Sequence, residues 1–126
     1  MNKVLMIEDE VDLVSFFEEA FKNFKHIQFF SSLRGREGIE IAKREKPDVV
    51  VLDLRMPGFS GEEALKELKP LLPRTKFIIV TAWNDGLTRE RIERDIGVEA
   101  YFEKPVDLEQ VMGKIMQFLM SGEKSG

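Results

Sequence analysis

Short apolar runs alternate along the chain with segments of helical periodicity. Unbroken runs rich in valine and isoleucine are typical of strands that are buried on both faces of a parallel sheet. Such runs occupy residues 4–7, 49–52, 77–80 and, more weakly, 100–102. Residues 27–30 are a further candidate, and their partial alternation indicates an edge strand.

Apolar residues recur at helical spacing between these runs. The stripe of the first helix consists of Leu13, Phe16, Phe17, Ala20, Phe21 and Phe24. Residues with capping or helix-breaking chemistry indicate the other boundaries. The second helix is expected to end before Pro47, and the third to begin at Ser60 and to fray at Pro70 or Pro73. The fourth helix is expected to cover residues 88–96 and to end at Gly97. Asp107 is expected to cap the fifth helix. This alternation predicts a three-layer α/β/α sandwich around a five-stranded parallel sheet with right-handed crossovers.

Length and composition limit the classes of function. A chain of 126 residues has the length of one domain, expected here over residues 1–120 and followed by a polar tail or the start of a linker at 121–126. The absence of cysteine and the single histidine, His26, exclude thiolate chemistry and multi-histidine metal sites. The net charge of -4 argues against direct binding to nucleic acid. The apolar runs are too short for a membrane span or a signal peptide, so a cytoplasmic location is expected.

Polar side chains follow the predicted strands at the points where the strands end. Glu8 and Asp9 come directly after the first strand, and Asp53 comes after the central one. Thr81 and Lys104 follow the last two strands. Because the carboxyl ends of parallel strands meet at one edge of a sheet, where ligands bind, we expect these side chains to lie close together.

The chemistry of these residues indicates metal-assisted phosphoryl transfer. Three carboxylates in one pocket repel one another, and a divalent cation together with the Lys104 ammonium offsets that cost. Oxygen ligands without histidine or cysteine favour Mg²⁺ or Mn²⁺. Asp53 is the best candidate for a nucleophile, because it ends the central apolar run and precedes a loop.

Four segments carry a resemblance to a known family. They are VLMIEDE at residues 4–10, PDVVVLDLRMPGFSG at 47–61, FIIVTAW at 77–83 and YFEKP at 101–105. In this order, over residues 3–119, the chain resembles a response-regulator receiver domain of the CheY-like kind. The resemblance implies the flavodoxin-like strand order 2-1-3-4-5. It also implies a signalling domain, not an enzyme, which takes a phosphoryl group from a histidine kinase or a phosphotransfer protein.

The resemblance implies a role for each of the strand-end residues. Asp53 would be the phosphoacceptor, and Asp9 and Asp53 would bind Mg²⁺ directly together with the backbone carbonyl of Arg55. Glu8 would act through a metal-bound water. Lys104 would hold the phosphoryl group, and the peptide bond that follows it, before Pro105, would be cis.

Other residues would report and regulate the phosphorylation. Thr81 would hydrogen-bond to the phosphoryl group, and Tyr101 would turn inward as the aromatic switch, although plain packing at an edge strand also explains an aromatic residue there. Arg55 and Trp83 stand two residues beyond Asp53 and Thr81, and would shield the acyl phosphate from water. The fourth helix, fifth strand and fifth helix would contact an output domain or effector, or a second copy after phosphorylation.

The sequence departs from the family pattern at two places. Glu8 stands where aspartate is usual and is one methylene longer; a water-mediated role tolerates this difference, and the longer side chain also permits direct contact with the metal. The interval from Thr81 to Lys104 is one residue longer than the common pattern, and we place the extra residue in the fourth helix, within residues 87–96. That helix has few apolar residues, so it is expected to dock weakly with a highly charged face, and to be mobile or bound to a partner.

Two other functions compete with phosphorylation-controlled signalling. A constitutive interaction module with the same fold is one, and Glu8 is the feature that favours it. A small magnesium-dependent phosphohydrolase of the haloacid-dehalogenase type is the other. Those enzymes carry a second aspartate two residues after the nucleophile, where this chain has Arg55, and no cap domain is evident.

Overall fold

The computed structural model describes residues 2–82 and 85–122. Its centre is a five-stranded parallel sheet in the order β2-β1-β3-β6-β7, which confirms the predicted α/β class and strand order. The strands of this sheet are β1 (Asn2–Ile7), β2 (Ile27–Ser32), β3 (Val49–Leu52), β6 (Lys76–Thr81) and β7 (Ala100–Glu103). β2 lies at one edge of the sheet, as its partial alternation indicated.

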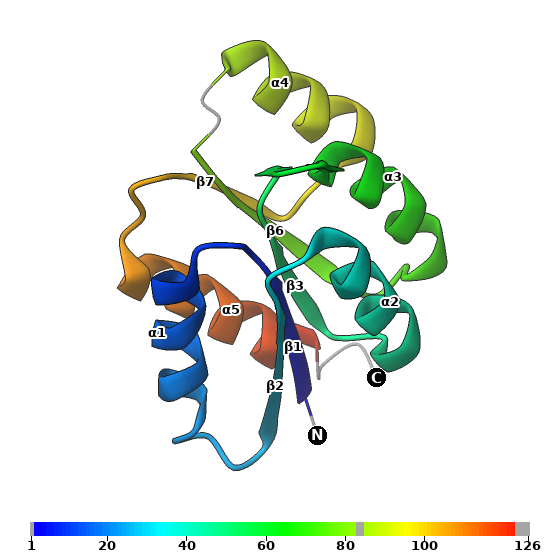
Figure 1. Cartoon of the computed structure of the whole chain (residues 1–126). Helices are drawn as coiled ribbons and strands as arrows, with labels where there is room; N and C mark the ends of the chain where they lie inside the picture. Colours follow the sequence, from blue (N-terminus) through cyan, green and yellow to red (C-terminus); the bar gives the residue numbers. More distant parts are fainter. Residues whose placement is uncertain (1, 83–84, 123–126) are drawn as a thin grey trace.

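Helices cover both faces of the sheet (Figure 1). They are α1 (Val11–Phe21), α2 (Gly35–Glu45), α3 (Gly61–Leu71), α4 (Gly86–Arg91) with the π-helical segment η1 (Ile92–Ile96), and α5 (Leu108–Gly122). One apolar core lies between the sheet and α1 with α5, and the other lies between the sheet and α2, α3 and η1. The three layers therefore agree with the predicted sandwich.

Strand β1 shows why the apolar runs are unbroken. Val4 and Met6 face the core beneath α1 and α5, whereas Leu5 and Ile7 face the core beneath α2 and α3. All four side chains are fully buried. Successive residues of a strand point to opposite faces, so a strand covered by helices on both sides needs apolar residues at every position.

Helix boundaries follow the predicted capping residues in most places. The Ser60 hydroxyl accepts a hydrogen bond from the Glu63 backbone N–H at 3.2 Å, and one Asp107 carboxylate oxygen accepts from the Glu109 N–H at 3.0 Å. Gly97 ends η1 with a φ of 87°, in the left-handed region that favours glycine. The prediction was wrong for Phe24, which lies beyond the end of α1.

A short antiparallel hairpin follows β3 and was not predicted. It pairs β4 (Arg55–Met56) with β5 (Phe59–Ser60). Its turn contains Pro57 and Gly58, and the φ of Gly58 is 67°. Strands of two residues are too short to leave a periodic pattern, which explains why the sequence showed only a loop here.

The fourth helix contains a change of helical type. The chain follows α-helical geometry in α4 and widens to π-helical geometry in η1, where the Gly97 N–H donates to the Ile92 carbonyl at 2.8 Å. A π turn holds one more residue than an α turn. The extra residue that we placed in this helix therefore has a position where the backbone can accommodate it.

Within residues 2–82 and 85–122, no helix combines the length and the apolar character that crossing a membrane requires. The longest helix, α5, has 15 residues, and among its described side chains only Val111, Ile115 and Leu119 are buried. It continues through Ser121 to Gly122, two positions beyond the domain end expected from the sequence.

Candidate functional site

Three carboxylates meet where β1 and β3 end. Glu8 and Asp9 follow β1, Asp53 follows β3, and one carboxylate oxygen from each lies within 4.8 Å of the others. The two strands are neighbours in the sheet, with Ile7 opposite Leu52, and the Asp53 N–H donates to the Ile7 carbonyl at 3.0 Å. The predicted convergence of acids from distant parts of the chain is therefore present.

Lys104 follows the edge strand β7 and contacts two of these carboxylates, those of Glu8 and Asp53. Its ammonium nitrogen lies 3.2 Å from Asp53 Oδ2 and 3.0 Å from Glu8 Oε1. The backbone N–H of Lys104 donates to the Thr81 carbonyl at 2.8 Å, which fixes the residue relative to β6. The bond between Lys104 and Pro105 is cis, as the resemblance implied.

Burial and charge shift the pKa values of Glu8 and Lys104 in the same direction. Burial is the largest effect on Glu8 and raises its pKa to about 7, and the neighbouring Asp53 charge adds to this. Burial alone would lower the pKa of Lys104, but its contacts with Glu10, Glu8 and Asp53 outweigh burial and raise the pKa above its ordinary value. The site thus holds more buried negative charge than one ammonium neutralises, which is the condition that favours an added cation.

The chain around Asp53 holds its carboxylate in place. The Arg55 N–H donates to Asp53 Oδ1 at 3.0 Å, and the side chain is only 4% exposed. The start of α3 packs against this segment at Gly61, where a Cβ atom would lie 2.5 Å from the Leu54 Cα and 2.8 Å from the Asp53 carbonyl oxygen. A side chain at Gly61 would therefore displace the backbone that carries Asp53.

Thr81 and Tyr101 lie on the two strands beside the acidic site. Thr81 ends β6 and is fully buried, and Tyr101 on β7 stands opposite Ile79 of β6. Tyr101 is 7% exposed, and among the described residues its buried hydroxyl has no hydrogen-bond partner. The Arg89 guanidinium lies over this ring, with its carbon 4.8 Å from the ring centre. Tyr101 is therefore packed inward beneath a charged residue of α4.

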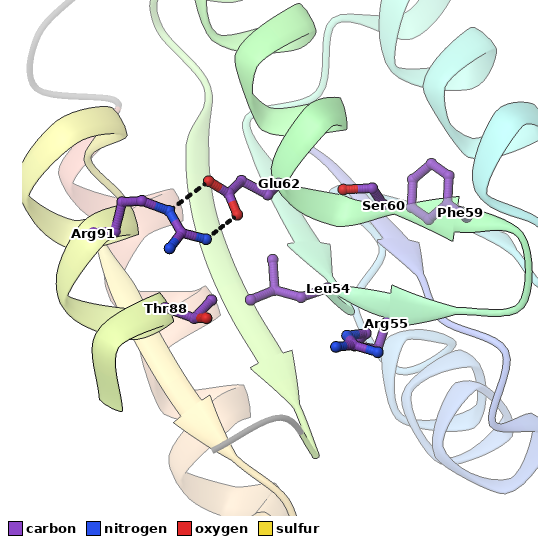
Figure 2. Close-up of a pocket in the computed structure, with 7 residues that line it drawn as sticks. All are labelled: Leu54, Arg55, Phe59, Ser60, Glu62, Thr88 and Arg91. Carbon is purple, nitrogen blue, oxygen red and sulfur yellow. Dashed lines mark hydrogen bonds and ion pairs between the residues drawn. The ribbon is translucent and has the colours of Figure 1, made fainter. Parts of the chain in front are cut away.

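A separate cavity of about 430 Å³ lies next to the segment that follows Asp53 (Figure 2). Leu54, Arg55 and Thr88 are among its lining residues. Figure 2 shows Arg91 and Glu62 at its margin, where Arg91 donates hydrogen bonds of 3.0 and 2.6 Å to the two Glu62 oxygens. The cavity therefore separates α4 from the β4–β5 hairpin, and the three clustered acids do not line it.

The sequence analysis did not predict every residue of the site. Glu10 was missed, although its Oε2 lies 2.6 Å from Lys104 Nζ. The available signal was the third acidic residue in the Glu8-Asp9-Glu10 triplet. Gly61 was noted only as part of a matching segment. Trp83 lies outside the described residues.

Comparison with known proteins places the chain in a family. Residues 4–116 match the family described as the response regulator receiver domain. The chain therefore belongs to the response-regulator receiver domains, the phosphoacceptor modules of two-component signal transduction, as the four segments predicted. Its acidic pocket suits a phosphoacceptor site, and neither the phosphohydrolase nor the constitutive module is favoured.

Relatives of different length share this domain. The chain is 29% identical over 118 residues to sporulation initiation phosphotransferase F of Bacillus subtilis, with 94% of each protein covered. It is 30% identical over 120 residues to response regulator ArlR of Staphylococcus saprophyticus, where it covers 94% of this chain and 53% of ArlR. A CheY-like receiver domain protein from Methanospirillum hungatei has the same fold, with a TM-score of 0.88 at 24% identity over 100% of this chain and 99% of that one. The chain thus spans nearly all of one relative and about half of the other.

Proposed function

We propose that Asp53 is the phosphoacceptor and that its donor is a phosphohistidine of a histidine kinase or phosphotransfer protein. A carboxylate oxygen of Asp53 would attack the phosphorus atom, the phosphorus–nitrogen bond would break, and the imidazole nitrogen would keep the electron pair. The product is an acyl phosphate on Asp53. The observation that carries this proposal is the buried Asp53 carboxylate, held by the Arg55 N–H at 3.0 Å and by Lys104 at 3.2 Å.

The donor set fits Mg²⁺, and Mn²⁺ is expected to substitute for it. The proposed ligands are Asp9, Asp53 and the backbone carbonyl of Arg55, with Glu8 acting through a water. Hard oxygen donors without nitrogen or sulfur are what Mg²⁺ prefers, and Mg²⁺ commonly keeps several waters. Glu8 Oε1 and Oε2 each lie 3.0 Å from Lys104 Nζ, which supports an indirect role for this side chain. The bound cation would neutralise phosphoryl oxygens during transfer.

Lys104 and Thr81 are proposed to hold the phosphoryl group once it is on Asp53. Lys104 already lies against the Asp53 carboxylate, and Thr81 ends the strand next to β3. Tyr101 is proposed to transmit the change to α4, β7 and α5, which would contact an output domain or effector, or a second phosphorylated copy. The buried Tyr101 ring beneath Arg89 supports this role, because its position depends on α4.

Arg55 and Trp83 are proposed to shield the acyl phosphate from water. The Arg55 side chain is exposed and lines the cavity beside the Asp53 segment. Replacing both residues with alanine is expected to shorten the lifetime of the acyl phosphate, measured by loss of the phosphoryl group over time by mass spectrometry. An unchanged lifetime would contradict this role.

Intact mass after incubation with acetyl phosphate, with and without Mg²⁺, tests the proposed function. We expect a gain of one phosphoryl group that requires Mg²⁺ and is absent in Asp53→Asn. A gain that persists in Asp53→Asn would move the site to another residue. No gain under any condition would favour the constitutive module, and Glu8→Asp would then be the first variant to test.

A further inference from the structure

Glu10 makes the shortest contact to Lys104 in the acidic site. Its Oε2 lies 2.6 Å from Lys104 Nζ, compared with 3.0 Å for Glu8 and 3.2 Å for Asp53. Glu10 precedes α1, and its backbone N–H donates to Glu8 Oε2 at 2.9 Å. The backbone of Glu10 thus contacts the buried Glu8 carboxylate, and its side chain contacts the Lys104 ammonium.

The three carboxylates around Lys104 differ in their access to water. The side chains of Glu8 and Asp53 are 2% and 4% exposed, whereas that of Glu10 is 59% exposed. A buried carboxylate that loses its partner bears the cost of an unpaired charge, whereas an exposed carboxylate is solvated by water. Glu10 is therefore the partner that Lys104 can leave at the smallest cost in free energy.

An ammonium group has three N–H donors and no acceptor. In this structure Lys104 directs its contacts to three carboxylates, those of Glu8, Asp53 and Glu10. A phosphoryl oxygen on Asp53 would need one of these donors. Transfer of Lys104 to the phosphoryl group therefore requires that one existing contact breaks, and the contact with Glu10 is the one that water can replace.

We propose that Glu10 is a positioning residue for Lys104. It draws the ammonium toward the start of α1 in the unphosphorylated protein and releases it when Asp53 carries the phosphoryl group. The negative charge of Glu10 also lies in the wall of the cleft that Lys104, Pro105 and Phe16 line, next to the phosphoacceptor. Glu10 thus opposes phosphorylation by competing for Lys104, a role that rests on the proposed phosphorylation of Asp53.

Labelling of Lys104 tests the contact without any phosphorylation. The variants are Glu10→Gln, which keeps the size of the side chain, and Asp12→Asn, which removes one charge from the same cleft. An amine-acylating reagent is applied to each unphosphorylated protein, and acylation of Lys104 is measured relative to Lys114 by peptide mass spectrometry. We expect several-fold faster acylation of Lys104 in Glu10→Gln and no change in Asp12→Asn. An unchanged rate in Glu10→Gln, or an equal increase in both variants, would overturn the proposal.

The initial rate of phosphorylation by acetyl phosphate with Mg²⁺ tests the consequence. The rate is expected to rise roughly two- to fivefold in Glu10→Gln at low ionic strength, the range typical of an exposed ion pair, and less at high salt. Asp12→Asn controls for the general effect of charge and should be phosphorylated at a rate near that of the wild type.

A wild-type protein that is phosphorylated at the same rate as Glu10→Gln would overturn the role of Glu10 alone. A wild-type protein that is not phosphorylated would overturn the proposed function, while the labelling result would still decide whether Glu10 positions Lys104.

Discussion

The α3 helix and the segment formed by α4 and η1 cover the same face of the sheet by different means. α3 buries Ala64, Leu65 and Leu68 in the core beneath it. Among residues 86–96, all of which the structure describes, only Thr88 and Ile92 are buried. Ile96 packs half-buried against the same core, and the other contacts of this segment are largely electrostatic and partly exposed.

Two arginines provide those contacts. Arg91 pairs with Glu62 at the start of α3, and Arg89 lies over the Tyr101 ring and 3.8 Å from Glu103. The expectation of weak apolar docking and a charged face agrees with this arrangement. Exposed ion pairs contribute little to stability, and their strength changes when a charge is added nearby. Apolar burial contributes more and does not respond to added charge. The segment next to Tyr101 is thus the part of this face that a new charge at Asp53 can rearrange at the smallest cost.

The largest expected difference between the two regions is in their response to removal of a buried side chain. Leu65 and Ile92 are both fully buried. Leu65→Ala should lower the free energy of unfolding by about 2–5 kcal/mol, measured by denaturant titration. Ile92→Ala should lower it less, because α4 and η1 can detach locally, and hydrogen exchange should accelerate within residues 86–96. Equal losses with uniform exchange would show that both regions belong to one cooperative unit.

A smaller effect is expected from the ion pair between Arg91 and Glu62. Glu62→Gln removes the charge that accepts hydrogen bonds of 3.0 and 2.6 Å from Arg91. Exchange within residues 86–96 should accelerate roughly two- to fivefold, as for other partly exposed pairs. Glu63→Gln is the matched control on the same turn of α3 and should leave exchange unchanged. An equal effect of both variants would attribute the change to the charge of α3 in general.

Acid should break the same ion pair without a mutation. The hydrogen bonds from Arg91 hold the pKa of Glu62 below its ordinary value of 4.5. A carboxylate with a lowered pKa in the folded state contributes stability above its unfolded pKa, and this contribution is lost as the pH falls through the folded value. The difference in exchange between wild type and Glu62→Gln should therefore be complete at neutral pH, begin to shrink near pH 4.5 and vanish only below the lowered pKa of Glu62.

The sequence predicted the sheet because burial on both faces leaves an unmistakable pattern. Residues 4–7, 49–52 and 77–80, which lie within β1, β3 and β6, are apolar at every position, and the order of the strands followed from the resemblance. The β4–β5 hairpin left no such pattern. Its strands have two residues each, and its geometry depends on the turn at Gly58 and on close packing at Gly61.

The sequence predicted those residues of the candidate site whose place follows from their position directly after a strand. Asp53, Asp9 and Lys104 follow strands, so parallel topology brings them together. Glu10 could not be assigned in this way, because its contact depends on the direction of a flexible side chain at the start of α1. The position of the Arg89 side chain over the Tyr101 ring likewise depends on the orientation of α4 and η1, which the sequence does not specify.

Hydrogen exchange of the phosphorylated protein tests most directly whether phosphorylation of Asp53 rearranges α4, η1 and β7. Wild type and Asp53→Asn would be compared in acetyl phosphate and Mg²⁺, with phosphorylation of the wild type verified by intact mass. We expect a change in exchange that is concentrated in residues 86–103, which contain α4, η1 and β7, while β1 and β3 stay unchanged. A fully phosphorylated protein whose exchange is unchanged in residues 86–103, or changed equally across the whole sheet, would contradict it.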